Sequence, residues 1–214
     1  MPRYRVAVLA SGEGTNLQGL IDQVHRPGIA EIVAVLSDKS GAGALRRAAS
    51  AGIFSRGLPH QSGEGRRSYH RRLADVLVPH QPDLVVLAGY MRLLPKEFLR
   101  RFSPVINVHP SLLPAFPGLD APGQAIARGV KVSGCTVHLV DGGMDTGPIL
   151  MQRALDVESG EAAKELHARI KVLERQCLVA VVTALAQGKL KLEGLLNSEE
   201  DCRGDKESAA QCIR

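Results

Sequence analysis

The feature that most constrains the fold is a series of short apolar runs separated by segments with helical spacing. The runs are rich in Val, Ile and Leu and lie at residues 6–10, 32–36, 83–88 and 105–108. The run at 83–88 is the clearest, because five of its six residues are apolar, as expected of a strand covered on both faces. Strands that alternate with helices at this spacing build right-handed βαβ units and an open parallel sheet.

The segments between these runs are expected to be helices that cover the sheet. Residues 17–21 have helical spacing, residues 42–51 are rich in Ala and Arg, and residues 66–78 are amphipathic with Tyr69 on the apolar side. A further short strand is expected at 54–58. Aromatic residues make up only 3% of the chain and Trp is absent, so the core must be aliphatic, which suits a parallel sheet.

The pattern changes after residue 108. Three prolines interrupt residues 110–118 and exclude regular structure there. Residues 133–140 and 148–157 are strand-like, and the loop at 141–147 that joins them is short and rich in Gly. Two strand-like runs joined by so short a loop predict an antiparallel hairpin, added to a mostly parallel sheet.

The chain closes with a long helix and a polar segment. The helix is expected over residues 161–187, with Gly188 as the residue that ends it and an edge strand at 189–193. We find no internal repeat and no linker that would divide the chain, so we expect one domain over residues 1–194. Residues 195–214 are polar and charged and are expected to be a disordered tail.

Charge and cysteine content narrow the functional classes. The net charge of +5 fits anionic small molecules, and aromatic residues do not interleave with the basic ones, so we expect no nucleic-acid partner. The four cysteines form no C-x-x-C pair and have no His at metal-ligand spacing, so we expect neither a disulfide framework nor a metal site, and a cytoplasmic location. No apolar run is long enough for a signal peptide or a membrane span, so no membrane partner is expected either.

A Gly-rich loop with the sequence S-G-E-G-T-N follows the first apolar run. Its glycines allow the backbone to approach an anion, and Thr15 or Asn16 can cap the following helix and donate to a phosphate oxygen. A dinucleotide fingerprint, weakly supported by Asp38, needs a third Gly where this chain has Leu17. We interpret the loop as a site for a single phosphate, with a capped tight turn as the purely structural alternative.

An Asn–x–His pair ends the strand expected at 105–108. Asn107 and His109 point to the same face, at the end of the sheet where open α/β proteins bind ligands. An amide can stabilise an oxyanion, and an imidazole can transfer protons near neutral pH. Asp145 would favour the charged form of His109 if the fold brings the two together, although Asp145 and Asp141 are equally well explained as turn residues.

Four motifs then occur in a recognisable order: S-G-x-G-T-N, A-G-Y-M-R-L-L at 88–94, N-V-H-P-S-L-L-P at 107–114 and M-D-T-G-P-I-L at 144–150. In this combination the chain resembles the phosphoribosylglycinamide formyltransferase family over residues 4–190. The resemblance implies a Rossmann-like open α/β sheet with helices on both faces. It also implies transfer of the formyl group of 10-formyltetrahydrofolate, as cosubstrate, to the amine of glycinamide ribonucleotide in purine biosynthesis. The reaction would proceed by direct amine attack and a tetrahedral intermediate, without a metal.

The resemblance also implies roles for individual residues, with phosphate bound in the N-terminal half and folate and catalysis in the C-terminal half. The catalytic residues would be Asn107, His109 and Asp145. The ribonucleotide contacts would be Gly14, Thr15, Asn16, Lys171 and Glu174. The folate contacts would be Arg66, Met91, Arg92, Leu93, Leu94, Asn107, Val140 and Asp141.

Some of these roles have open alternatives. Arg67 can take the role given to Arg66, and Lys171 and Glu174 would otherwise be interpreted as an ordinary surface pair. His138 is interpreted as structural. The segment at 119–122 reads L-D-A-P where many relatives carry histidines, so the pH response of that loop in relatives is not transferred.

Other functions remain as alternatives. The methionyl-tRNA formyltransferase carries an added C-terminal domain and the formyltetrahydrofolate deformylase an added N-terminal one, and we expect neither domain here. A binding module without chemistry need not combine Asn107, His109 and Asp145. A nicotinamide-dependent dehydrogenase lacks support because of the missing third Gly. The expectation that the protein forms a homodimer rests on the resemblance alone.

Overall fold

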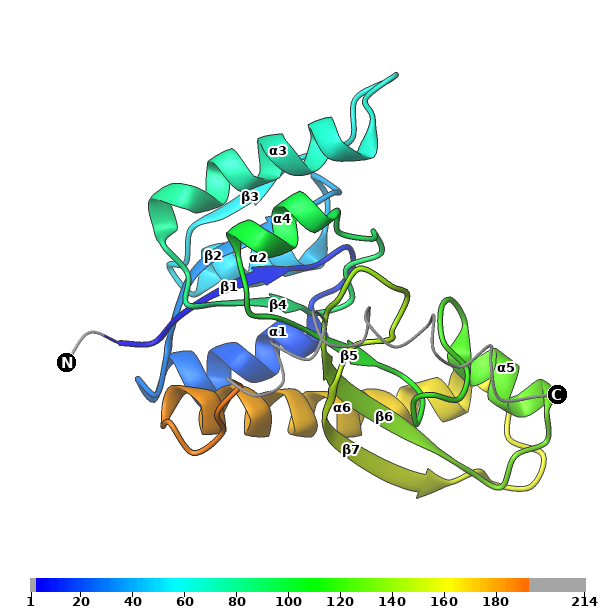
Figure 1. Ribbon diagram of the computed structural model, residues 1–214. Coiled ribbons are helices and arrows are strands. Elements are labelled where there is room, and N and C mark those ends of the chain that lie inside the picture. The colour runs from blue at the N-terminus through cyan, green and yellow to red at the C-terminus, as the bar shows by residue number, and fades with distance from the viewer. Residues whose placement is uncertain (1–2, 193–214) are drawn as a thin grey trace, which may run out of the picture.

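Seven strands form a single sheet in the computed structural model, which describes residues 3–192 (Figure 1). The strand order is β3-β2-β1-β4-β5-β6-β7. The first five strands in the chain are parallel, whereas β6 is antiparallel to β5 and β7 is antiparallel to β6. Their bounds are β1 Arg5–Leu9, β2 Glu31–Ser37, β3 Ser55–Gly57, β4 Leu84–Leu87, β5 Val105–His109, β6 Val132–Leu139 and β7 Ile149–Asp156.

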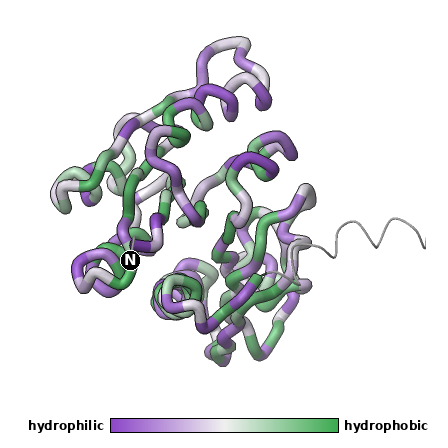
Figure 2. Tube along the Cα trace, turned by 60° about the vertical axis from the view of Figure 1, so that its left-hand side comes forward, coloured by the Kyte–Doolittle hydropathy of each residue, from purple (hydrophilic) through white to green (hydrophobic). Residues whose placement is uncertain are grey.

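Helices cover both faces of this sheet. The α-helices are α1 Thr15–Leu20, α2 Gly43–Ser50, α3 Arg66–Leu77, α4 Lys96–Arg101, α5 Ala121–Ala127 and α6 Ala163–Ala186. Helix α1 continues into a π-helical turn, Ile21–His25, and α3 into a 3-10 turn, Val78–His80. Along the helices hydrophobic and hydrophilic positions alternate (Figure 2), as expected when one side of each helix packs on the sheet. None of the described helices is both long and apolar enough to cross a membrane.

Alternating side chains of the strands separate two hydrophobic cores. On β1, Val6 and Val8 pack into the core beneath α1, α2, α5 and α6. Ala7 and Leu9 point to the other face and pack into the core beneath α3 and α4. This alternation is the period-two geometry of a strand, and it buries side chains on both faces of the parallel strands.

The open, mostly parallel α/β sheet with an antiparallel hairpin is confirmed, and the differences are local. Helices α4 and α5 were not anticipated, because six and seven residues are too few to show a helical period. The edge strand expected at 189–193 is wrong for residues 189–192, which carry no strand. Residue 193 and the expected tail at 195–214 lie outside the described residues, and the single-domain assignment stays a prediction.

Helix α6 offers a direct test of how much its buried side contributes to stability. Ile170 is fully buried in the core, whereas Val172, two residues later, is 45% exposed. We expect Ile170→Ala to lower the free energy of unfolding by about 2–5 kcal/mol, because it removes buried methyl groups and leaves a cavity. Val172→Ala is expected to change it by less than about 0.5 kcal/mol. Urea unfolding followed by circular dichroism measures both, and equal effects would contradict the packing described here.

Candidate active site

A cavity of ≈ 700 Å³ opens at the carboxyl ends of the parallel strands. Its wall is formed by the loop after β1, the ends of β4 and β5, the segment before α5, the β6–β7 loop and one face of α6. This is the edge at which open α/β sheets bind ligands, because the connections there lie outside the sheet and are free to carry functional groups. The cavity therefore contains residues from both halves of the chain.

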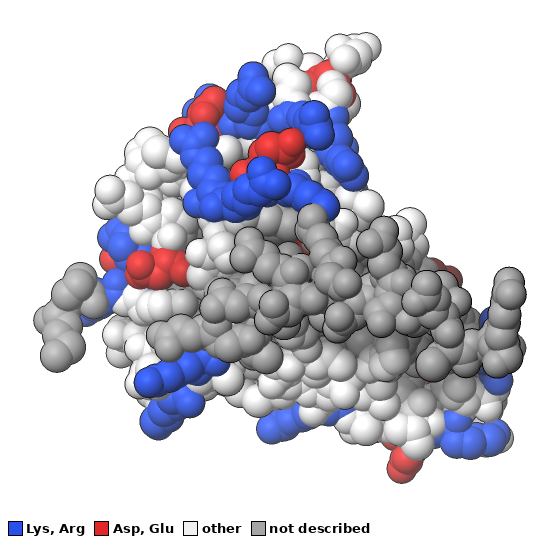
Figure 3. All heavy atoms as spheres, viewed as in Figure 1, with Lys and Arg blue, Asp and Glu red and all other residues white. Residues whose placement is uncertain are grey.

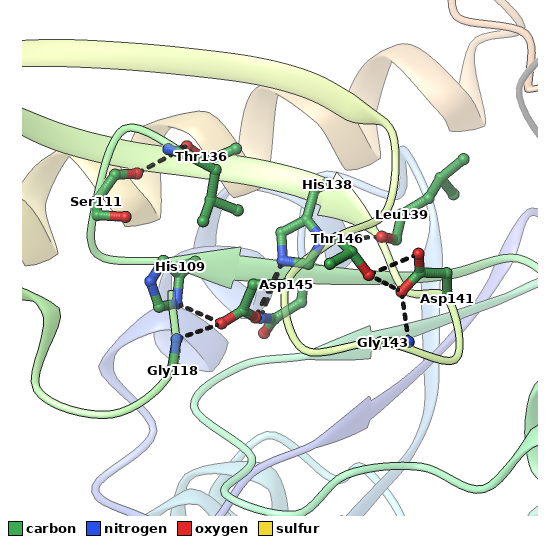
Figure 4. A network of polar contacts seen from close by, with 12 residues as sticks. His109, Ser111, Gly118, Thr136, His138, Leu139, Asp141, Gly143, Asp145 and Thr146 are labelled. Atoms are coloured by element: carbon green, nitrogen blue, oxygen red, sulfur yellow. Dashed lines mark hydrogen bonds and ion pairs between the residues drawn. The ribbon is translucent and has the colours of Figure 1, made fainter. Parts of the chain in front are cut away.

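His109 ends β5 and is held between two acceptors. Its Nε2 lies 2.8 Å from the carbonyl oxygen of Phe116, and a carbonyl can only accept, so Nε2 carries a proton. Its Nδ1 lies 3.4 Å from Oδ2 of Asp145 (Figure 4). Both acceptors gain a donor only when the ring is protonated on both nitrogens.

Asp145 is the polar centre of the site. It accepts a hydrogen bond from the backbone N–H of Gly118 at 2.9 Å (Figure 4). Its Oδ1 lies 3.5 Å from Nδ2 of Asn107. Burial raises the pKa of Asp145, but contacts with His138, the Gly118 N–H and the charge of His109 outweigh it and hold the pKa below its usual value. Asp145 thus stays a carboxylate beside His109, which confirms the proximity that the sequence left open.

His138 lies in this cluster, although the sequence pattern alone was interpreted as giving it a structural role. The register of β5 and β6 places His138 directly opposite Asn107. Its Nε2 lies 3.3 Å from Nδ2 of Asn107 and 3.5 Å from Oδ1 of Asp145, while Nδ1 is 2.8 Å from the carbonyl oxygen of Leu139. Alternation along β6 correctly put His138 and Val137 on opposite sides. Only the pairing register with β5 shows that the side of β6 that carries His138 faces Asn107 and the cavity.

The loop after β1 forms another part of the wall. Gly14 has a φ of 75°, and a Cβ there would lie 2.7 Å from Cα of Ala44, so only Gly fits. Gly14 is the N-cap of α1 and no side chain caps this helix, so the expected capping by Thr15 or Asn16 is wrong. Gly14, Thr15 and Asn16 nevertheless all line the cavity.

Glu174 is buried rather than part of a surface pair. It is only 5% exposed and accepts a hydrogen bond of 3.1 Å from Nδ2 of Asn16. Burial raises the pKa of Glu174, although the Asn16 bond and the nearby charge of Lys171 act against this. Lys171 lines the same cavity on the solvent side of α6, and His167 lines it one helical turn earlier. The sequence did not single out His167, because its role depends on which side of α6 faces the cavity.

The structure places the residues that the resemblance assigned to folate in two neighbouring cavities. The cavity is lined by most of them, namely Met91, Arg92, Leu93, Leu94, Asn107, Val140 and Asp141. Arg66 does not: it lines an adjacent cavity of ≈ 330 Å³, together with Arg67.

Among the residues assigned to folate, Arg92 and Asp141 already form hydrogen bonds within the protein. The Nε of Arg92 lies 2.9 Å from Oδ2 of the buried Asp38, and its guanidinium lies over the ring of Tyr69 at 5.1 Å. The Asp141 carboxylate accepts hydrogen bonds from the Gly143 N–H and the Thr146 hydroxyl. Arg92 and Asp141 therefore shape the loops that border the cavity. Within residues 3–192, no group of three or more His, Cys, Asp or Glu side chains is arranged to hold a metal ion.

The raised pKa of Glu174 generates a prediction about stability and pH. A carboxyl with a higher pKa in the folded state than the usual 4.5 opposes folding once the pH is high enough to ionise it. Glu174→Gln is therefore expected to unfold at higher urea concentration than the unsubstituted protein at pH 8, in the absence of ligands. The gain should shrink as the pH falls toward and below 4.5.

Glu64 provides a control, because its pKa is shifted in the opposite direction to that of Glu174. A hydrogen bond from Arg72 holds the pKa of Glu64 down, to about 2. Glu64→Gln should therefore be less stable than the unsubstituted protein at pH 8, and this loss should shrink as the pH falls from 4.5 toward 2. A stability difference for Glu174→Gln that is the same at pH 8 and pH 4 would show that burial does not disfavour its charge.

Comparison with known proteins identifies the family. The model of the formyl transferase family matches residues 4–182. The chain is 46% identical over 185 residues to the phosphoribosylglycinamide formyltransferase of Mycobacterium tuberculosis, covering 85% of each protein. It is 44% identical to the trifunctional purine biosynthetic protein adenosine-3 of Drosophila pseudoobscura pseudoobscura, but spans only 14% of that protein's length.

A solved structure agrees with the sequence matches. The glycinamide ribonucleotide transformylase 1 of Symbiobacterium toebii superimposes with a TM-score of 0.86 at 41% identity, covering 90% of this chain and 92% of that one. Sequence and fold match together over most of the described residues. The chain therefore belongs to the formyl transferase family and, within it, to the phosphoribosylglycinamide formyltransferases.

Proposed function

We propose that the chain transfers the formyl group of 10-formyltetrahydrofolate to the amine of glycinamide ribonucleotide, a step of purine biosynthesis. The observation that carries this proposal is the meeting of Asn107, His109 and Asp145 in one cavity at the end of β5. An amide donor, a protonated imidazole and a carboxylate are the groups that acyl transfer to an amine requires.

The two sides of the cavity suit two different ligands. Gly14, Thr15, Asn16, Lys171 and Glu174 offer backbone N–H groups, one cation and a carboxylate, which fit a phosphate, an amine and ribose hydroxyls.

The other side is apolar and suits the rings of the folate. Met91 and Leu93 are 65% and 47% exposed at the cavity wall, where a flat aromatic ligand would cover them. Leu94, Val140 and the backbone around Asp141 continue this wall. We assign this side to the folate, which supplies the formyl group as cosubstrate.

In the proposed mechanism, the free amine attacks the formyl carbon and a new C–N bond forms. The former carbonyl oxygen then carries negative charge, which the Asn107 amide and the imidazolium of His109 stabilise by hydrogen bonding. The bond from the formyl carbon to N10 breaks next. The attacking nitrogen loses one proton and N10 gains one, so no net proton is consumed.

Asp145 acts on this reaction through His109 and through the proton transfer. Its carboxylate lies 3.4 Å from Nδ1 of His109 and so favours the charged ring in the orientation seen here. It also lies where it can relay a proton from the attacking amine toward N10, directly or through water. The cytoplasmic location and the homodimer expected from the sequence remain predictions.

A spectrophotometric assay with 10-formyltetrahydrofolate tests the proposal, run with and without glycinamide ribonucleotide. We expect deformylated folate to appear only when the ribonucleotide is present. Product without the ribonucleotide would indicate a deformylase instead. No product in either case would leave a binding module as the function to pursue.

His109→Ala is expected to lower kcat by about 10²–10⁴-fold, because the imidazolium that stabilises the oxyanion is lost. The KM values should change much less. The control is His60→Ala, which removes an exposed histidine outside both cavities and should retain full activity. Turnover of His109→Ala close to that of the unsubstituted protein would rule the mechanism out.

Lys171→Ala is expected to raise the KM for the ribonucleotide by about tenfold, since it removes one charge-assisted contact to the phosphate. The KM for the folate should be unaffected, because Lys171 lies on the other side of the cavity. Lys164→Ala, on the same helix but outside the cavity, is the matched control. A change in the folate KM alone would contradict the assignment of the two sides.

A further inference from the structure

The wall assigned to the folate comes in large part from residues 88–95, the connection between β4 and α4. These residues belong to neither helix nor strand, so no regular series of backbone hydrogen bonds holds them. Their geometry must therefore come from contacts with other parts of the chain. One such contact fixes the backbone, because the N–H of Met91 donates to Oγ of Ser11 at 3.0 Å.

The side chains of this segment alternate between exposed and buried positions. Met91 and Leu93 are exposed at the cavity wall, whereas Tyr90 and Leu94 are buried in the core beneath α3 and α4. Arg92 stands between these two buried residues, and its guanidinium makes its contacts inside the protein. Arg92 is thus the middle one of three anchors that keep Met91 and Leu93 at the cavity wall.

The contact that holds Arg92 is with a buried carboxylate. Its Nε donates to Oδ2 of Asp38 at 2.9 Å, and the Asp38 side chain is only 5% exposed. The other oxygen, Oδ1, is also buried and has no hydrogen-bond partner among residues 3–192. Movement of Arg92 into water would leave the charge of Asp38 buried and uncompensated, which is much more costly than separating an exposed pair. Asp38 therefore holds Arg92 in place.

Exposed arginines nearby are held much less firmly. Lys and Arg gather on the surface over α3 and α4 (Figure 3), and Arg67 and Glu97, which pair at 3.3 Å, both have exposed side chains. Pairs of this kind contribute little to stability, because water competes for both partners. The burial of Asp38 is therefore what distinguishes Arg92 from the arginines of this surface.

Asp38 directly follows β2, where a dinucleotide-binding protein has the acidic residue that binds a ribose. Here the carboxylate of Asp38 faces Arg92, and Asp38 lines neither of the two cavities. A ligand could reach this carboxylate only if the ion pair opened. Asp38 therefore acts within the protein, on the segment that carries Arg92.

We propose that Asp38 is a positioning residue for the folate. Through Arg92, it sets where Met91 and Leu93 meet the rings of 10-formyltetrahydrofolate. Because these two residues contact the folate only under the proposed function, this role of Asp38 rests on that function. Loss of Asp38 frees Arg92 to turn toward water, and the segment then loses the middle of its three anchors. The ribonucleotide side is built on the loop after β1 and on α6 and should change little.

The first test is the kinetics of Asp38→Ala. The KM for 10-formyltetrahydrofolate should rise about tenfold, the scale of one lost charge-assisted hydrogen bond. The kcat and the KM for the ribonucleotide should change by less than about twofold. Asp38→Asn keeps an oxygen that can accept from Nε of Arg92 and should restore most of the folate KM. An unchanged folate KM in Asp38→Ala would overturn the inference, and so would equal changes in both KM values.

A pair of further variants tests whether Asp38 acts through Arg92. Arg92→Ala should raise the folate KM at least as much as Asp38→Ala does. Asp38→Ala/Arg92→Ala should raise it no further than Arg92→Ala alone, because both substitutions remove the same contact. Effects that multiply in the double variant would show that Asp38 acts by another route and would overturn the inference.

The matched control is Arg72→Ala. Arg72 also lies over the ring of Tyr69, at 5.5 Å, and pairs with Glu64 at 2.8 Å, but it lines neither cavity. Its removal should lower the free energy of unfolding and leave the folate KM unchanged. A rise in the folate KM as large as that of Arg92→Ala would show that stability, rather than the position of residues 88–95, sets the KM.

Hydrogen exchange separates this role of Asp38 from the proposed function, because it needs neither ligand nor turnover. In Asp38→Ala, we expect the amide hydrogens of residues 88–94 to exchange about tenfold faster than in the unsubstituted protein, since local opening becomes easier. In Arg72→Ala they should exchange at the unsubstituted rate. Unchanged exchange in Asp38→Ala would overturn the inference. An unsubstituted protein without turnover would count against the proposed function alone, and exchange would still decide whether Asp38 holds the segment.

Discussion

The antiparallel pairing of β6 with β5 is the constraint on which the site depends. In a wholly parallel sheet, the chain that follows β6 would leave from the same edge as the chain that follows β5. Here β6 runs the other way, so its end at Leu139 lies opposite Ile106. The β6–β7 loop therefore begins beside the amino end of β5 and turns back along that strand, so that Asp145 reaches Asn107 and His109, the latter 36 residues earlier in the chain. Thr136 strengthens this junction, because its hydroxyl donates to the carbonyl of Ser111 at the start of the proline-rich segment.

Two carboxylates in the cavity, the partly buried Asp145 and the buried Glu174, show how hydrogen bonding and burial compete. Burial acts on Asp145 and Glu174 in the same direction, since both lose water around the charge. Asp145 faces an N–H of the backbone and two histidines, and these donors keep its pKa low. Glu174 has Asn16 and a more distant Lys171, which do not offset burial. The same carboxyl group thus has a lowered pKa beside His109 and a raised pKa on α6.

Much of the fold followed from local pattern. The strands at β1, β2, β4 and β5 are apolar runs whose length and composition need no tertiary context, and Gly188 with its φ of 66° ends α6 as expected. Short helices were missed because α4 and α5 begin at positions set by their loops, such as the Asp120 cap that accepts from the Gly123 N–H. Asn107 and His109 were predicted together, since two residues apart on one strand share a face. His138 was not, because its partner is on another strand.

The sequence alone determined the order of the strands and of the longer helices, the apolar faces that pack, and the presence of an Asn–x–His pair at the end of a buried strand. These are local properties, set by periods of two and 3.6 residues and by the conformations of Gly and Pro. The tertiary structure decided which distant side chains meet. The register of β5 and β6 brought His138 to Asn107, the rotation of α6 buried Glu174 against Asn16, and the approach of α4 to Gly142 placed Lys96 beside the cavity. Such contacts depend on packing over the whole sheet, and no local period in the chain encodes them.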